Sequence, residues 1–130
     1  MGVMVRERAL SVVLILVGLL FSAAAYPAIG GLLDPAHSDT GDTMQMAIYA
    51  CLGVFLLIAA RNPGAHRSLI AFAAWSSFAH AAVMSTLGLE IASQRTGFLT
   101  ASVILIVIGV VLIVLAPAKP SGQTTAAAAV

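Results

Sequence analysis

One histidine of this sequence, His80, lies in the middle of a long apolar stretch, far from any formal charge. If this stretch is helical, a period of 3.6 residues places Ser77, His80 and Met84 on one face. In a membrane such a face turns inward, because imidazole and hydroxyl groups need hydrogen-bond partners there. Tyr49, in the preceding apolar stretch, is expected at a comparable depth. These four residues are the leading candidates for binding a small ligand or an ion.

Several kinds of chemistry fit this group of residues. The imidazole of His80 and the thioether of Met84 together suit a soft metal such as copper. A haem iron held between helices typically needs two axial ligands, so the single histidine within the apolar stretches would require two copies of the protein. The structural alternative is a neutral His80 that is hydrogen-bonded to Ser76, Ser77, Tyr49 or a backbone carbonyl. The sequence leaves these interpretations open, and it predicts no cofactor.

A second candidate site is the acidic segment between the first two apolar stretches, which contains Asp34, His37, Asp39 and Asp42. Carboxylate oxygens and imidazole nitrogens are common ligands of divalent metals. Aspartate also serves turns and helix caps, and either Asp42 or Thr43 is expected to cap the following helix. The segment is therefore a weak candidate for a metal site.

Four uncharged stretches must position these residues. They cover residues 9–33, 43–60, 68–89 and 96–118. A helix needs roughly 20 mostly apolar residues to cross a bilayer core, and an ionised group at its centre costs about 2.5–3.5 kcal/mol. Only 8% of the chain is charged and 61% is hydrophobic, whereas soluble domains carry about 25% charged residues. The sequence therefore predicts an integral membrane protein.

The predicted fold class is all-α: a transmembrane four-helix bundle that forms a single domain over residues 1–118. The helices are expected at about residues 5–25, 44–60, 68–89 and 96–115, with a disordered cytoplasmic tail at 119–130. The first helix should end near Pro27, before an external loop over residues 28–43. The tight turn at 61–64 predicts that the second and third helices form an antiparallel hairpin. The fourth helix, which is almost purely aliphatic, should face lipid.

The charged residues alternate in sign from one gap to the next. Basic residues occupy the N-terminus, the second gap and the tail: Arg6, Arg8, Arg61, Arg67 and Lys119. Acidic residues dominate the other two gaps: Asp34, Asp39, Asp42 and Glu90. Cytoplasmic loops are enriched in Lys and Arg, so both termini are expected in the cytoplasm. Arg61 and Arg67 are then expected at phospholipid head groups.

The start of the chain also resembles a secretory signal peptide. Arg6 and Arg8 precede an apolar run that ends in three alanines, Ala23 to Ala25, which fit a cleavage site. Cleavage would leave three crossings, and the remaining loop charges would still obey the positive-inside rule. We expect the first helix to be retained.

Several enzyme classes lack their required residues. The sequence has no G-x-S-x-G, no H-E-x-x-H, no phosphate-binding loop and no pair of carboxylates within the apolar stretches. Membrane thiol oxidoreductases need paired cysteines, whereas Cys51 is the single cysteine and is expected to be a small core residue. Small four-helix multidrug transporters depend on a membrane-embedded glutamate in the first helix, and the uncharged stretch 9–33 of this chain has no carboxylate. There is also no basic patch for nucleic acid.

The central part of the chain, residues 46–84, resembles an uncharacterised family of small bacterial four-helix integral membrane proteins. The likeness rests on Tyr49, Leu52-Gly53, Ala60-Arg61-Asn62-Pro63, Arg67-Ser68-Leu69, Trp75-Ser76-Ser77 and His80-Ala81. The resemblance implies a four-crossing bacterial membrane protein. It carries no activity and no functional residues, because the family has no known activity.

The leading functional hypothesis is a non-enzymatic accessory or oligomeric protein of the bacterial inner membrane. The lack of any complete reaction centre motivates it. Gly18 and Ser22 support it, since pairs of small residues one turn apart allow a neighbouring helix to approach closely. Its expected partners are the lipid bilayer and either a second copy or another membrane subunit. The alternative is a small transporter or ligand-binding protein centred on His80. A weaker alternative is a redox protein that binds haem or copper at the same residue.

Overall fold

The computed structural model describes residues 2–117, and all regular secondary structure in this part of the chain is helical. Its elements are α1 (Gly2–Ser22), α2 (Ala25–Leu33), α3 (Thr40–Ala59), the 3-10 turn η1 (Pro63–His66), α4 (Arg67–Glu90), the 3-10 turn η2 (Ala92–Gln94) and α5 (Arg95–Leu115). Four helical segments of the described chain are long and apolar enough to cross a membrane: Gly2–Leu33, Thr40–Ala59, Pro63–Glu90 and Ala92–Leu115. The all-α class and the four apolar helices are thus confirmed. The tail expected at 119–130 lies outside the described residues.

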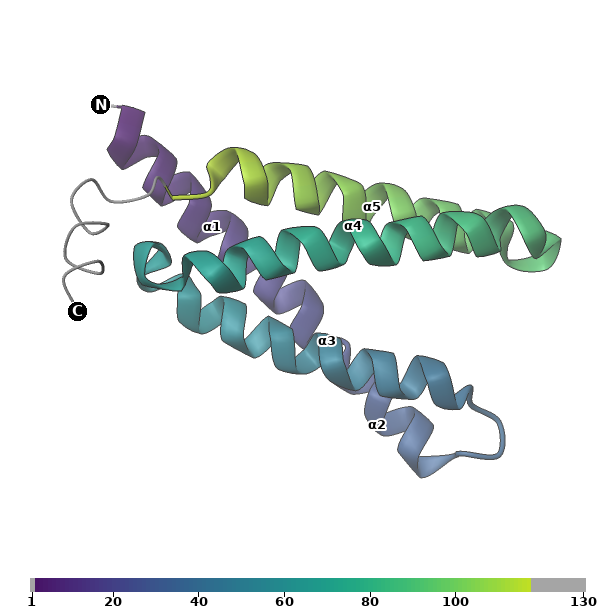
Figure 1. Cartoon of the computed structure of the whole chain (residues 1–130). Coiled ribbons are helices and arrows are strands. Elements are labelled where there is room, and N and C mark those ends of the chain that lie inside the picture. The colour runs from purple at the N-terminus through teal and green to yellow at the C-terminus, as the bar shows by residue number, and fades with distance from the viewer. Residues whose placement is uncertain (1, 118–130) are drawn as a thin grey trace, which may run out of the picture.

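The helices form two hairpins (Figure 1). In the first hairpin, α3 packs along α1 and α2, and in the second, α5 packs along α4, while few contacts join α3 to α4. The prediction that the tight turn pairs the second and third helices is therefore wrong. The turn through η1 instead connects the two hairpins, since α3 packs mainly on α1 and α4 packs mainly on α5.

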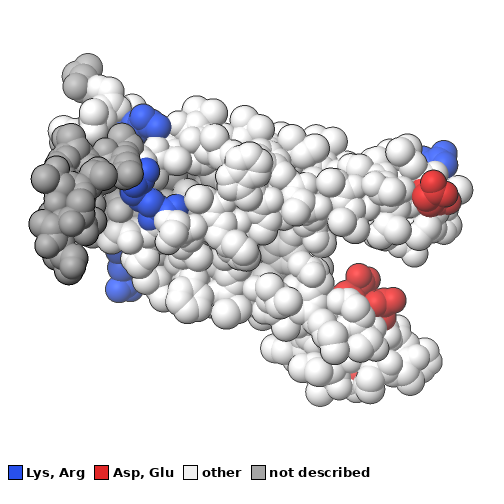
Figure 2. Space-filling view, viewed as in Figure 1, with Lys and Arg blue, Asp and Glu red and all other residues white. Residues whose placement is uncertain are grey.

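Charge divides the molecule into two ends (Figure 2). The basic end holds the start of α1, the turn η1 and the end of α5, and the acidic end holds the α2–α3 and α4–α5 connections. The hairpins lie against each other at the basic end and diverge toward the acidic end (Figure 1). The largest fully buried apolar side chains lie in the basic half: Leu10, Leu14, Leu56, Ile70 and Leu112.

Small residues set the distance between α1 and α3. A Cβ atom added to Gly53 of α3 would lie 2.7 Å from the carbonyl oxygen of Gly18 and would also overlap Ser22. A Cβ atom added to Gly18 would lie 2.9 Å from the side chain of Leu57. The small pair of the first helix therefore serves a close helix contact as expected, but its partner is α3 of the same chain.

The second hairpin also has a close helix contact at a glycine, and a hydrogen bond between the two helices is added to it. The ring of Phe78 lies over Gly109, where an added Cβ atom would approach it to 2.6 Å. Ser102 of α5 is buried and donates a hydrogen bond of 3.1 Å to the carbonyl oxygen of Ala81 on α4. One face of α5 is thus buried along α4, while many of its other aliphatic side chains, such as Val103, Val107 and Val114, are exposed, in keeping with a helix that faces lipid.

The first apolar segment is interrupted at Ala23, and Pro27 explains why. A proline lacks an N–H group, and its ring crowds the carbonyl of the residue four positions earlier. The helix resumes as α2, so most of the expected loop at 28–43 is helical and only the connection between Leu33 and Thr40 is not. The cap of α3 is Asp39, which accepts a hydrogen bond of 3.0 Å from the backbone N–H of Asp42.

Arginine side chains bind the open carbonyls at helix ends. Arg6 donates to the carbonyl oxygens of Val114 at 3.1 Å and Ala116 at 2.7 Å. Arg67, which was expected at lipid head groups, is half-buried and donates to the carbonyl oxygen of Pro117 at 3.1 Å. These contacts tie α1 and α4 to the end of α5, where a cation also complements the helix dipole.

Candidate functional site

A cavity of about 230 Å³ lies among the four long helices. All four contribute to its wall: Leu20, Phe21 and Ala24 from α1 and its end, Met46 and Tyr49 from α3, His80 and Met84 from α4, and Ala101, Ile104, Leu105 and Ile108 from α5. Almost the whole wall is apolar. The cavity is therefore formed by residues of both hairpins.

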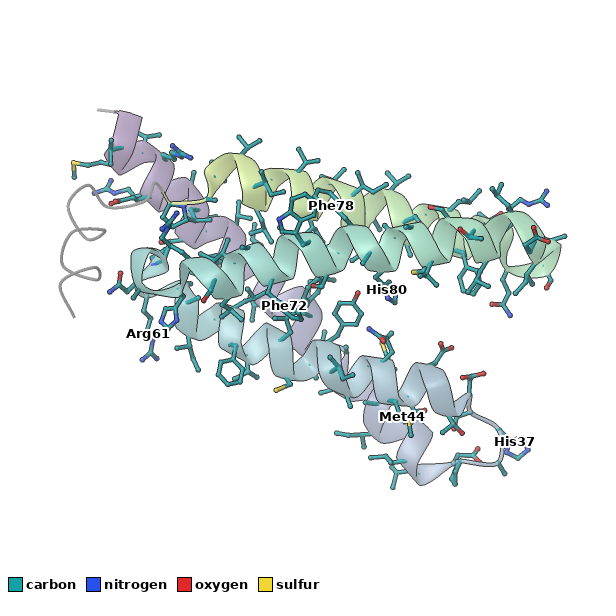
Figure 3. The ribbon with its side chains drawn as sticks, viewed as in Figure 1. His37, Met44, Arg61, Phe72, Phe78 and His80 are labelled. Atoms are coloured by element: carbon teal, nitrogen blue, oxygen red, sulfur yellow. The ribbon has the colours of Figure 1, made fainter. Side chains whose placement is uncertain are left out.

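His80 is the side chain of this wall that could donate or accept a hydrogen bond, take up a proton or bind a metal. Figure 3 shows it on the side of α4 that faces the gap between the hairpins. Its ring meets the ring of Tyr49 edge-on, with centroids 5.3 Å apart, and Tyr49 in turn meets Phe21 at 4.9 Å. Within residues 2–117 no side chain or carbonyl hydrogen-bonds to the His80 ring. Its nitrogens are therefore available to a ligand in the cavity.

The structure brings three of the four predicted residues together. Tyr49, His80 and Met84 line the cavity, whereas Ser77 does not. Ser77 is buried and donates a hydrogen bond of 2.7 Å to the carbonyl oxygen of Ala73 in its own helix. Ser76 bonds to the same carbonyl at 3.2 Å, so neither serine is the partner that a purely structural His80 was expected to use.

Sequence reasoning missed the apolar residues of the wall. Phe21 and the four residues of α5 carry no chemical signal by themselves, and only the hairpin geometry places them beside His80. Met46 lines the same cavity as Met84. Cys51, expected in the core, is exposed on α3 instead.

The acidic segment shows local pairing. His37 Nδ1 lies 3.0 Å from Asp34 Oδ1, and Asp39 is occupied as the cap of α3. His37 lies in the connection at the tip of the first hairpin, well away from His80 (Figure 3). In the described chain no three His, Cys, Asp or Glu side chains gather as a metal site. Asp34 and Asp39 thus make local hydrogen bonds within the connection.

The comparisons with known proteins extend the resemblance seen in the central part of the sequence. A family model described as a family of unknown function (DUF6632) matches residues 4–129 of the 130-residue chain. The chain belongs to this family. No curated protein and no solved structure matches it.

Proposed function

We propose that this member of the family binds a small amphipathic molecule in the cavity around His80, within the inner membrane of a bacterium. The observation that carries the proposal is the composition of the cavity wall. All four long helices contribute to it, it is almost entirely apolar, and its one imidazole has no hydrogen-bond partner among residues 2–117. Apolar pockets with a few polar groups are the usual form of small-molecule sites.

The size of the cavity limits the ligand. Its volume of about 230 Å³ is below the roughly 300–1,000 Å³ of sites that enclose drug-sized ligands. It therefore accommodates one end of a larger molecule, whose remainder extends between the diverging hairpins. The rings of Phe21 and Tyr49 favour a flat headgroup, because aromatic rings pack well against one another.

The hydrogen-bonding capacity of His80 limits the class of ligand further. A neutral imidazole carries one donor and one acceptor nitrogen. His80 can thus bind a carbonyl or a hydroxyl group at the deep end of the ligand. The proposed ligand class is a planar, oxygen-bearing headgroup on an apolar tail, taken from the lipid phase.

Orientation follows from the distribution of charge. With the basic end in the cytoplasm, in accord with the positive-inside rule, both termini lie inside and the hairpins diverge toward the outer surface. A ligand would then enter the cavity from the outer half of the bilayer.

The accessory or oligomeric role ranks second, for a structural reason. Part of its motivation was the pair Gly18 and Ser22, and this pair packs against Gly53 of the same chain. The described residues assign no other surface to a second copy or another subunit.

The test is to identify what co-purifies with the native protein and with cavity variants. Protein purified in mild detergent is extracted with organic solvent, and the extract is analysed by mass spectrometry. We expect one amphipathic compound near stoichiometric amount, reduced about tenfold by His80→Ala, since a buried hydrogen bond contributes about 1–1.5 kcal/mol.

Two matched variants separate loss of the site from loss of the fold. Ala101→Phe fills the cavity, and Ala79→Phe adds the same bulk on an exposed face of α4. The compound should disappear with Ala101→Phe and remain with Ala79→Phe, while both proteins elute normally from a sizing column. Equal amounts in all variants would refute the proposal. Copper at stoichiometric amount, lost with His80→Ala, would replace it by the redox alternative, with Met46 and Met84 as sulfur ligands.

A further inference from the structure

A second cavity lies at the basic end, and nothing in the proposed function uses it. Its volume is about 790 Å³. Three separate segments form it: the first turns of α1, the turn between α3 and α4, and the end of α5 at Leu115 and Pro117. We infer that this cavity binds the phosphate headgroup of an anionic phospholipid.

Charge is the first argument. The residues that line the cavity include three arginines, Arg6, Arg8 and Arg61, and one carboxylate residue, Glu7. Asn62 adds an amide from the turn. The wall thus carries a net positive charge.

The availability of these donors is the second argument. Arg6 is engaged with the terminal carbonyls of α5, at 3.1 Å and 2.7 Å. Arg8 and Arg61 make no hydrogen bond and no ion pair with any residue between 2 and 117. Each guanidinium presents five N–H donors in a planar fork, which matches two oxygens of a phosphate group.

The surroundings favour a lipid over a free anion. The same cavity is walled by apolar side chains of α1, among them Met4, Leu10 and Val12. These residues lie where the chain enters its first apolar stretch, at the level of the membrane interface. Basic pockets between spanning helices on the cytoplasmic side are known to bind acidic lipid headgroups, whose acyl chains cover the apolar wall. Inorganic phosphate would leave that wall uncovered.

The experiment compares two phospholipids that differ only in their headgroup. Delipidated full-length protein is titrated with phosphatidylglycerol or phosphatidylcholine of identical acyl chains, and bound lipid is counted by native mass spectrometry. The wild type should prefer phosphatidylglycerol. Arg8→Gln and Arg61→Gln should each weaken this lipid about fivefold, and the double variant about 25-fold, with phosphatidylcholine unchanged.

Other substitutions in the same cavity wall are expected to change the affinity for phosphatidylglycerol in different directions. Glu7→Gln removes the opposing charge and should strengthen phosphatidylglycerol binding about fivefold. Arg8→Lys with Arg61→Lys keeps the charge but loses the planar fork, so it should fall between the wild type and the double glutamine variant. Because Arg8 and Arg61 make no hydrogen bond to any residue between 2 and 117, their variants should keep the helical circular dichroism of the wild type.

Two outcomes overturn the inference. One is an unchanged preference for phosphatidylglycerol in the double glutamine variant. The other is displacement of the bound lipid by equimolar inorganic phosphate, which would assign the cavity to a soluble anion. The test is independent of the His80 cavity, which lies nearer the acidic end, so either assignment can fail alone.

Discussion

His80 of α4 and Tyr49 of α3 meet with their ring planes perpendicular and their centroids 5.3 Å apart. The two helices belong to different hairpins and otherwise share few contacts. This pair is therefore a bridge between the hairpins as well as part of the cavity wall, and its two roles can be separated experimentally.

The bridge predicts energetic coupling between the two residues. In a double-mutant cycle of Tyr49→Leu and His80→Leu, the coupling should be about 0.5–1.5 kcal/mol, the usual value of an edge-to-face aromatic pair. Unfolding by sodium dodecyl sulfate in mixed micelles measures the free energies. The control cycle replaces Tyr49→Leu with Tyr26→Leu, because Tyr26 is 86% exposed. Coupling of the same size in both cycles would contradict the bridge.

Gly53→Ala tests the close contact of α1 with α3. The added methyl group would overlap Ser22 and lie 2.7 Å from the carbonyl oxygen of Gly18, so the helices must move apart. Overpacking of this kind costs about 1–3 kcal/mol. The melting temperature in detergent should fall accordingly.

Gly30→Ala is the matched control for this substitution. Gly30 is also helical, but nothing lies within 4 Å of its added Cβ atom. This variant should be unchanged or more stable by roughly 0.5–1 kcal/mol, because alanine favours the helix. A stable Gly53→Ala protein would show that α1 and α3 are not held at this distance.

Arg67→Gln and Arg6→Gln test the attachment of α5 at the basic end. The half-buried Arg67 should contribute about 1.5–3 kcal/mol through its bond to the carbonyl of Pro117, and the exposed Arg6 less. Hydrogen–deuterium exchange should rise in the last turn of α5 in both variants. Arg95→Gln is the control: Arg95 bonds to the carbonyls of Gly88 and Leu89 at the acidic end, so exchange should rise there instead.

Single cysteines test the proposed orientation. In a Cys51→Ala background, Asn62→Cys marks the basic end and Gln94→Cys marks the acidic end. With the basic end in the cytoplasm, a membrane-impermeant maleimide added outside spheroplasts should label Gln94→Cys and not Asn62→Cys. Lysed spheroplasts should allow both to react. The reverse pattern would invert the topology and move the phospholipid cavity to the outer leaflet.

Part of the candidate site was visible in the sequence, and part was not. The spacing of Ser77, His80 and Met84 placed them on one helical face, and that face is indeed turned inward or half-buried. The spacing could not show that Ser77 is buried and hydrogen-bonded within its own helix, while His80 and Met84 border a cavity. The difference depends on which helix lies opposite each position.

The sequence alone determined the class of the protein, its four apolar helices and the separation of basic from acidic ends. These features follow from the local sequence, because charged side chains and backbone N–H and C=O groups without hydrogen bonds cost free energy in a bilayer. Only the tertiary structure decided the pairing of helices, the continuation of the first segment past Pro27, and the meeting of His80 with Tyr49 and Phe21. The physical reason is that lipid-facing and protein-facing sides of a membrane helix are equally apolar, so hydrophobicity does not mark the contact face. The contact face is marked by its shape, through small residues such as Gly18 and Gly53. Whether two such faces fit each other depends on how both helices are placed in the tertiary structure.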